Sequence, residues 1–168
     1  MAIATPTSEY ARALAENERY AAQFNRSALP MPPGRKLAVI ACMDARLTVE
    51  DALGLRTGDA HVIRNAGGLA SDDAIRSLVI SQELLGTEEV LVIGHTDCGM
   101  LTFQDEAVQR DLAERTGADP DLPLGAFSDL ERSVREQVDR IRDHPWTKDV
   151  PVHGLVFHTE SGRLREVV

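Results

Sequence analysis

Apolar residues follow two patterns that alternate along this chain from about residue 36 onward. Short, nearly continuous apolar runs at 36–42, 61–64 and 89–93 are typical of strands buried on both faces of a parallel sheet. Residues 72–85 and 128–144 instead repeat apolar positions at helical spacing, with charged residues on the opposite face. Strands that alternate with helices predict an α/β fold with a central, mostly parallel β-sheet flanked by helices.

The remaining parts of the chain show other patterns. Residues 152–158 and 164–168 flank the turn-forming segment 160–162, which predicts a hairpin at one edge of the sheet. The stretch 104–127 is polar and contains Gly and Pro, so we expect a short helix followed by a surface loop. Residues 8–26 form an amphipathic helix pattern before a Pro-rich linker. This helix is expected either to pack on the core or to form an arm that contacts a second subunit.

The composition is that of an ordinary globular protein, with 43% hydrophobic and 27% charged residues in a chain of 168. We expect one domain over 1–168, with an N-terminal helical arm at 1–28 and an α/β core at 35–168. The net charge of −9 would repel nucleic acids and acidic lipid surfaces. The chain starts without the pattern of a signal peptide and has no run of ~20 apolar residues, so we expect a cytoplasmic protein with no membrane partner.

Two cysteines, too few for a disulfide framework, occupy comparable places in the predicted sheet. Cys42 ends one apolar run and Cys98 follows another, at the edge where open α/β sheets bind ligands. His95 precedes Cys98 by three residues, and two thiolates with one imidazole suit tetrahedral zinc with a fourth position left for water. If Cys98 begins a helix, the N–H groups and dipole there would lower the pKa of its thiol.

Asp44 and Arg46 place a carboxylate and a guanidinium in the loop that leaves Cys42. Taken singly, a cysteine at the end of an apolar strand is usually a buried small side chain. Both cysteines, a histidine and an Asp/Arg pair at strand ends together favour a site. A non-catalytic zinc-binding or redox-sensing protein is the alternative, although a closed structural zinc site would have no use for the neighbouring pair.

The order and spacing of these residues resemble the β-class carbonic anhydrases. That family carries Cys-x-Asp-x-Arg on one loop, an Arg-Asn-Ala-Gly segment, and His-x-x-Cys on another loop. The chain has Arg-Asn-Ala-Gly-Gly at 64–68, between the other two motifs. The residues that match those two motifs are Cys42, Asp44, Arg46, His95 and Cys98.

The resemblance implies a Zn²⁺ cofactor on Cys42, His95 and Cys98, with Asp44 and Arg46 as the catalytic pair. It implies a homodimer, or a dimer of dimers, in which the N-terminal helices clasp the partner. The implied reaction is reversible hydration of carbon dioxide to bicarbonate and a proton, by attack of zinc-bound hydroxide. Asp44 would also bind the metal in a closed state, if it leaves Arg46.

The predicted substrate pocket and the identity of the substrate depend on finer features. Gly67 and Gly68 are expected to line the pocket. Met43 stands where the family commonly has Ser, Met100 follows Gly99 where Ala is commoner, and the chain is short for the family. In these features the chain resembles a small bacterial subgroup of the family that includes carbonyl sulfide hydrolases. Carbonyl sulfide is therefore an alternative substrate at the same zinc site.

Overall fold

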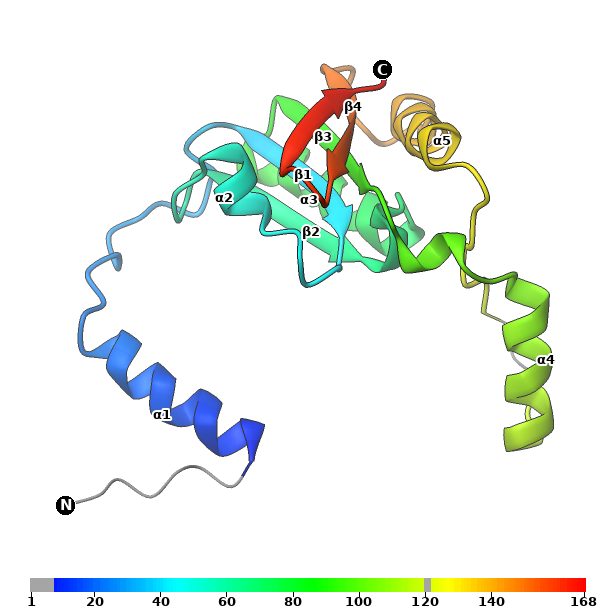
Figure 1. Cartoon of the computed structure of the whole chain (residues 1–168). Coiled ribbons are helices and arrows are strands. Elements are labelled where there is room, and N and C mark those ends of the chain that lie inside the picture. Colours follow the sequence, from blue (N-terminus) through cyan, green and yellow to red (C-terminus); the bar gives the residue numbers. More distant parts are fainter. Residues whose placement is uncertain (1–7, 120–121) are drawn as a thin grey trace. The chain divides into compact units, whose positions relative to one another are not determined.

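The computed structural model describes residues 8–119 and 122–168. The chain divides into two units, with the boundary between Pro30 and Met31 (Figure 1). The second unit holds the sheet and every residue of the predicted site. None of the helices in the described parts of the chain is long and apolar enough to cross a membrane.

The first unit contains helix α1 (Glu9–Ala21), which corresponds to the amphipathic pattern at 8–26. Ser8 caps the helix by accepting a hydrogen bond from the backbone N–H of Ala11. None of the helix residues is buried, and Tyr10 is among its exposed apolar side chains.

The second unit is built on a five-stranded sheet in the order β2-β1-β3-β4-β5. The first four strands are parallel, and β5 is antiparallel to β4, which confirms the mostly parallel sheet and its edge hairpin. Every residue of β1 is buried, as its continuous apolar run predicts. The strands are β1 (Leu37–Cys42), β2 (Ala60–Asn65), β3 (Glu89–His95), β4 (Val152–His158) and β5 (Arg163–Glu166).

In the described part of this unit, four α-helices lie between the strands. They are α2 (Val49–Leu53), α3 (Asp72–Leu85), α4 (Asp105–Thr116) and α5 (Leu130–Arg142). Helix α3 has the predicted bounds because both of its caps are local: Ser71 caps its start, and Gly86, at φ 76°, ends it. Helix α2 was not predicted, since five residues are too few to show a helical period.

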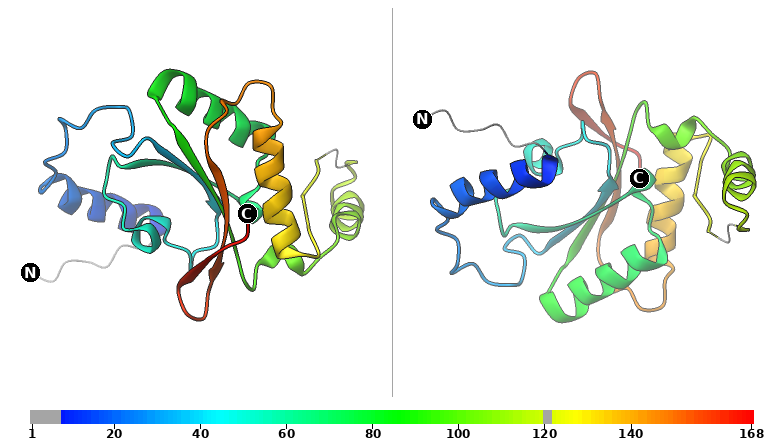
Figure 2. Two further views of the ribbon diagram at one scale, coloured as in Figure 1. Left: turned by 90° about the horizontal axis from the view of Figure 1, so that it is seen from above. Right: turned by 90° about the horizontal axis from the view of Figure 1, so that it is seen from below.

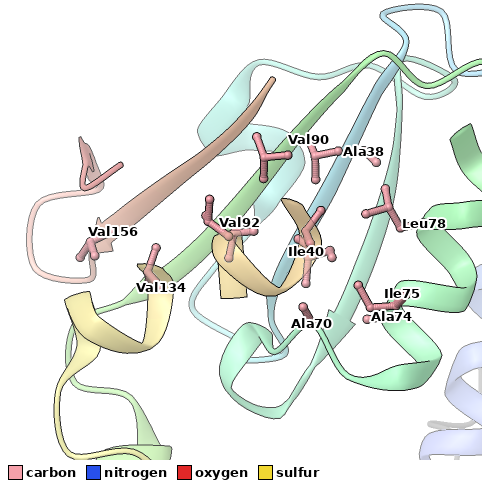
Figure 3. Close-up of a cluster of buried hydrophobic side chains, with 13 residues drawn as sticks. Ala38, Ile40, Ala70, Ala74, Ile75, Leu78, Val90, Val92, Val134 and Val156 are labelled. Atoms are coloured by element: carbon pink, nitrogen blue, oxygen red, sulfur yellow. The ribbon is translucent and has the colours of Figure 1, made fainter. Parts of the chain in front are cut away.

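The two faces of the sheet bury different side chains of the same strands. Ala38 and Ile40 of β1 pack with apolar residues of α3 and α5 (Figure 3). Val39 points to the other face and belongs to the cluster that includes α2. Figure 2 shows α3 and α5 on one side of the sheet and α2 on the other. The sheet is therefore the middle layer of three, and its strands are fixed from both sides.

The strand order creates a switch point between β1 and β3. From β1 the chain passes to β2 on one side, and after α3 it returns to β3 on the other side of β1. The connections diverge at such a point, which leaves room for a ligand beyond the carboxyl ends of the strands. Cys42 is the last residue of β1, and His95 is the last residue of β3.

Candidate metal centre

Three side chains with metal-binding atoms meet at this switch point. Cys42 and His95 come from the ends of adjacent strands, and Cys98 comes from the turn that follows β3. The two sulfur atoms lie 4.0 Å apart, and one ligand atom from each of the three residues lies within 4.8 Å of the others. All three residues are buried, so the structure brings the predicted ligands together.

The donor set fits zinc by chemistry and by distance. Two sulfurs at the usual Zn–S length in a tetrahedron are separated by about 3.8 Å, close to the separation between Cys42 and Cys98. Nε2 of His95 is buried and has no hydrogen-bond partner among the described residues. A buried polar atom of this kind is unfavourable unless it is satisfied, and a metal ion would satisfy it.

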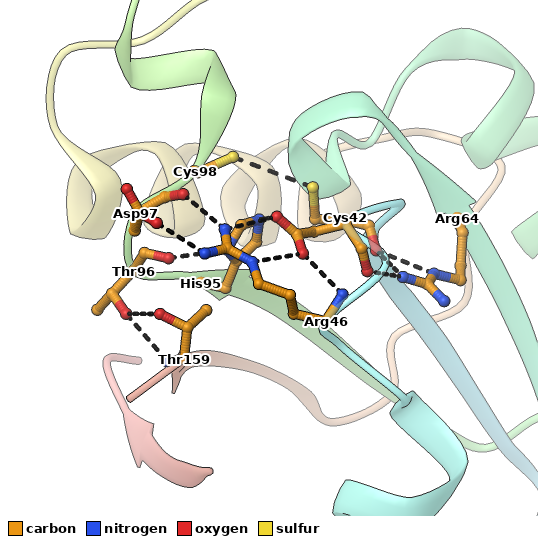
Figure 4. Close-up of polar contacts among 9 residues, drawn as sticks. Cys42, Arg46, Arg64, His95, Thr96, Asp97, Cys98 and Thr159 are labelled. Atoms are coloured by element: carbon orange, nitrogen blue, oxygen red, sulfur yellow. Dashed lines mark hydrogen bonds and ion pairs between the residues drawn. The ribbon is translucent and has the colours of Figure 1, made fainter. Parts of the chain in front are cut away.

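A hydrogen bond to Thr96, which is itself held by β4 and by the residue that follows it, sets the orientation of the imidazole. Nδ1 of His95 lies 2.9 Å from the carbonyl oxygen of Thr96 and donates to it, which directs Nε2 toward the two sulfurs. The Thr96 N–H donates to the carbonyl of Phe157. The Thr159 N–H donates to the Thr96 hydroxyl oxygen (Figure 4). The end of β4 therefore positions a side chain at the end of β3.

The two thiols differ in their tendency to ionise. Burial disfavours the Cys42 thiolate, but its interaction with His95 and hydrogen bonds from the backbone of Asp44 and Gly67 outweigh burial and lower its pKa to about 7. Burial and the neighbouring Cys42 raise the pKa of Cys98 to about 11. The sequence predicts a lowered pKa for Cys98 only if this residue begins a helix, and a three-residue 3₁₀ turn follows it instead.

Asp44 and Arg46 form a charged pair beside the ligand group. The Nε and Nη2 groups of Arg46 donate to the two carboxylate oxygens of Asp44 at 3.0 and 2.8 Å, and the Arg46 backbone N–H donates at 2.8 Å. These bonds hold the pKa of Asp44 well below its usual range. Oδ2 of Asp44 lies 3.8 Å from Nε2 of His95, so the predicted pair adjoins the predicted ligands.

Arg64 holds the loop that carries Cys42 and Asp44, a contact that the sequence analysis did not predict. Its Nε and Nη2 groups donate to the carbonyl of Cys42 at 2.9 and 2.7 Å, and Nη2 also donates to the carbonyl of Asp44 at 2.7 Å (Figure 4). Arg64 lies 22 residues from Cys42 in sequence. In the sequence, the place of Arg64 in the Arg-Asn-Ala-Gly-Gly segment was the one feature that pointed to a role at the site.

Gly67 and Gly68 are both buried next to the ligand group. A Cβ atom on Gly68 would lie 2.9 Å from the backbone nitrogen of Cys42 and 3.0 Å from the carbonyl oxygen of Ile93, so only glycine allows this close approach. A Cβ on Gly67 would lie 3.3 Å from side-chain atoms of Leu69 and Met100. The close backbone contacts at Gly68 and the φ of 84° at Gly67 favour glycine at these positions. The predicted role of both in a substrate pocket stays a prediction.

Comparison with known proteins shows the family of this chain. Residues 37–119 match the carbonic anhydrase family. β-Carbonic anhydrase 1 of Mycobacterium tuberculosis is 47% identical over 164 residues, which are 97% of this chain and 98% of that protein. A carbon disulfide hydrolase of Acidithiobacillus thiooxidans is 40% identical over 161 residues, with 83% of this chain and 81% of that protein covered.

Similarity in three dimensions extends over the same length. The crystal structure of carbonic anhydrase from Streptococcus mutans superposes with a TM-score of 0.91 at 39% identity, covering 98% of this chain and 100% of that chain. Since sequence and fold agree over nearly all residues, the chain belongs to the β-carbonic anhydrase family of enzymes.

Proposed function

We propose that this enzyme catalyses the reversible hydration of carbon dioxide to bicarbonate and a proton, with zinc held by Cys42, His95 and Cys98. The convergence of two sulfurs and one imidazole beside the Asp44–Arg46 pair carries this proposal. Zinc in this group would supply a Lewis acid that makes the reacting water more acidic. The neighbouring side chains would orient that water and exclude others.

Asp44 is proposed to orient the reacting water. Its Oδ2 atom faces the ligand group, 3.8 Å from Nε2 of His95. An ionised carboxylate accepts hydrogen bonds and donates none, so Asp44 would accept one from the water and direct a free lone pair of the water oxygen toward the substrate carbon.

Arg46 is proposed to decide which of two roles Asp44 performs. While Arg46 donates to both carboxylate oxygens, Asp44 stays beside the ligand group and is free to orient water. Released from Arg46, Asp44 would need to move only a short way to become a fourth ligand, which would exclude the water. The Arg46-bound arrangement in the structure corresponds to the active state of this proposal.

The surroundings of the ligand group suit a small apolar substrate. Cys42, Cys98 and Met100 form a buried cluster with the apolar side chains of Phe103 and Phe127 packed against it. Carbon dioxide has no net dipole and is not excluded by such side chains, whereas they do not solvate ions. Substrate would thus approach from an apolar side and meet the polar pair at the ligands.

A second candidate substrate class is carbonyl sulfide, which would react with water to give carbon dioxide and hydrogen sulfide. The observation that favours it is the 40% identity with a carbon disulfide hydrolase. The C=S compounds are also small, linear and apolar. The same ligand group and the same pair would then orient water toward a thiocarbonyl carbon.

We further propose that the protein forms homodimers, alone or paired into dimers of dimers, through α1. Large apolar side chains exposed on α1 and just after it support this proposal, because a cluster of this kind marks an interaction surface. They are Tyr10, Leu14, Tyr20 and Phe24.

The proposed reaction is tested by stopped-flow measurement of carbon dioxide hydration with zinc-loaded protein. Parallel assays follow the consumption of carbonyl sulfide and carbon disulfide, with detection of sulfide. Asp44→Asn should lose most of the activity while zinc stays bound, and Asp73→Asn, a change at an exposed carboxylate on α3, should leave the rate unchanged. Zinc-loaded protein that acts on none of the three substrates would favour a non-catalytic zinc-binding or redox-sensing function instead.

A further inference from the structure

The guanidinium of Arg46 is shared between two aspartates. On one edge, Nε and Nη2 donate to the carboxylate of Asp44. On the other side, Nη1 donates to Oδ2 of Asp97 at 2.7 Å, and Nη2 donates to the backbone carbonyl of Asp97 at 3.0 Å (Figure 4). Arg46 lies in the loop after β1, and Asp97 lies in the turn after β3. This contact therefore joins the segments that follow the two strands ending in Cys42 and His95.

The backbone of Asp97 has an unusual conformation that makes the double contact possible. Its φ of 55° lies in the left-handed region, which residues with a side chain seldom adopt, although Asp tolerates it better than most. In this conformation the carbonyl and the carboxylate of one residue both reach the same guanidinium. Strained conformations of this kind persist where the surrounding structure maintains them, often at functional sites.

We infer that Asp97 is a positioning residue, which holds Arg46 in the orientation that keeps Asp44 beside the ligand group. The inference deepens the proposed function and rests on it. The Arg46 side chain is 50% exposed, so with contacts on one edge alone it would retain freedom to rotate into solvent. Contacts on two edges restrict that freedom, and they keep Arg46 in place when Asp44 moves.

This geometry predicts how loss of the Asp97 carboxylate changes the mobility of Arg46. Without the Asp97 carboxylate, Arg46 would sample other rotamers, and Asp44 would be released toward the ligands more often. Competition would have the opposite effect, because Asp97 and Asp44 share one positive charge and removal of Asp97 would strengthen the remaining pair. The two effects change the mobility of Arg46 in opposite directions, which allows a clear test.

Three substitutions of Asp97 separate the carboxylate from the backbone strain. Asp97→Ala removes the carboxylate and keeps a side chain at positive φ, Asp97→Gly removes both the carboxylate and the strain, and Asp97→Asn keeps an oxygen acceptor. Asp73→Ala is the matched control. The Asp73 side chain is 77% exposed, as is that of Asp97, and it pairs with Arg76 at 2.8 Å.

The measurement is hydrogen exchange of the Arg46 Nε–H, followed by ¹⁵N NMR on zinc-loaded protein and identified by its loss in Arg46→Lys. Exchange should be about two- to fivefold faster in Asp97→Ala and in Asp97→Gly, the range expected for an exposed ion pair, and Asp97→Asn should restore much of the protection. The kcat for carbon dioxide hydration should fall by a similar factor with KM unchanged. Asp73→Ala should match the wild type in both measurements.

Exchange that is unchanged or slower in both Asp97→Ala and Asp97→Gly overturns the inference. So does a defect in Asp97→Ala that Asp97→Gly relieves, since strain and not the contact would then be responsible. An inactive wild-type enzyme would overturn the proposed function, whereas Arg46 exchange would still report whether Asp97 holds that side chain.

Discussion

The sulfur atoms of Cys42 and Cys98 belong to the same candidate ligand group, but the surroundings of the two thiols differ. Backbone N–H groups of Asp44 and Gly67 point at the Cys42 thiolate, and His95 lies beside it. Cys98 is buried with less compensation, and the nearby Cys42 disfavours a second negative charge. The pair is therefore prepared to ionise in sequence, Cys42 first, and a cation that binds both sulfurs would favour the second ionisation.

Loss of a single ligand should remove zinc from the protein. Cys98→Ser keeps the shape of the side chain but replaces a thiolate donor, and we expect zinc affinity to fall by more than about 100-fold, beyond the loss caused by residues that only orient ligands. His61→Ala is the control, because this histidine bonds Ser81 away from the site. Metal analysis after dialysis measures the effect, and full zinc content in Cys98→Ser would contradict the ligand assignment.

The rate of hydration should rise with pH between 6 and 9. In the proposed site two thiolates would neutralise the charge of zinc, so the reacting water would be less acidic than at a three-histidine site, where its pKa is about 7. Asp44 cannot cause the rise, since Arg46 holds its pKa well below its usual range and it is already ionised at pH 6. Stopped-flow rates at constant ionic strength test this, and a flat profile would count against the proposed mechanism.

The same assay separates the function of Arg46 from metal binding. Arg46→Ala removes all side-chain donors to Asp44 and should lower the rate, while the zinc content stays that of the wild type. A loss of zinc in this variant would instead mean that Arg46 supports the ligand loop as a whole.

At the scale of elements, helix α5 packs on β3 and β4 because glycines allow close approach. A Cβ on Gly154 would lie 2.7 Å from a methyl carbon of Val134 and 2.8 Å from one of Val168. Both neighbours are β-branched and have little freedom to move. The position of α5 therefore depends on the absence of a side chain in the middle of β4.

Gly154→Ala should lower the free energy of unfolding by about 1–3 kcal/mol, the usual effect of overpacking. Adding Val134→Ala creates room, so the double variant should be more stable than the sum of the two single changes predicts. Urea denaturation measures all three variants. Gly99→Ala is the control, because a Cβ there meets no atom within 4 Å, and strict additivity in the double variant would contradict the close contact.

Asp105, at the start of α4, holds the loop that returns from this helix. Its carboxylate accepts hydrogen bonds from the backbone N–H groups of Leu124, Gly125 and Ala126 at 2.8 to 2.9 Å. The bonds from Ala126 and Gly125 lower the pKa of Asp105 below its value in an unfolded chain, about 3.9. The stabilisation is therefore complete above that unfolded value and is lost as pH falls through the lower folded value.

Asp105→Asn should increase amide exchange in 122–127 about tenfold at pH 7, as expected from the loss of one charge-assisted hydrogen bond. The difference from the wild type should shrink once the pH falls below the folded pKa of Asp105. Hydrogen exchange with mass spectrometry compares the two proteins at each pH. Asp111→Asn, on the same helix, controls for the change in charge. An equal increase of exchange in this variant would contradict the role of Asp105 in holding residues 122–127.

At the scale of the whole molecule, the proposed assembly gives a direct test. Deletion of residues 1–28 should shift the protein from dimer toward monomer, since it removes the exposed apolar side chains of α1. Sedimentation velocity at several concentrations measures the change, with Arg19→Ala in the full chain as a control that alters only a surface charge of α1. An unchanged dimer would place the interface elsewhere.

The single-domain organisation and the cytoplasmic location stay predictions from the sequence.

Much of the fold could be predicted from the sequence because its causes are local. A strand buried on both faces needs a continuous apolar run, which marks β1, and the caps of α3 are single residues, Ser71 and Gly86. The site residues were predictable for a related reason. Cys42 and His95 stand at strand ends, and parallel strands place those ends at one edge.

Only the tertiary structure decided which side-chain atoms meet and how deeply each is buried. The contact of Arg46 with Asp97 joins residues 51 positions apart, and no spacing along the chain predicts it. The sequence does not predict the raised pKa of Cys98, because burial depends on residues brought from elsewhere in the fold. The sequence by itself determined the sheet, its carboxyl edge and the five candidate residues of the site there. Hydrogen bonding and burial among distant residues determined how those five are held.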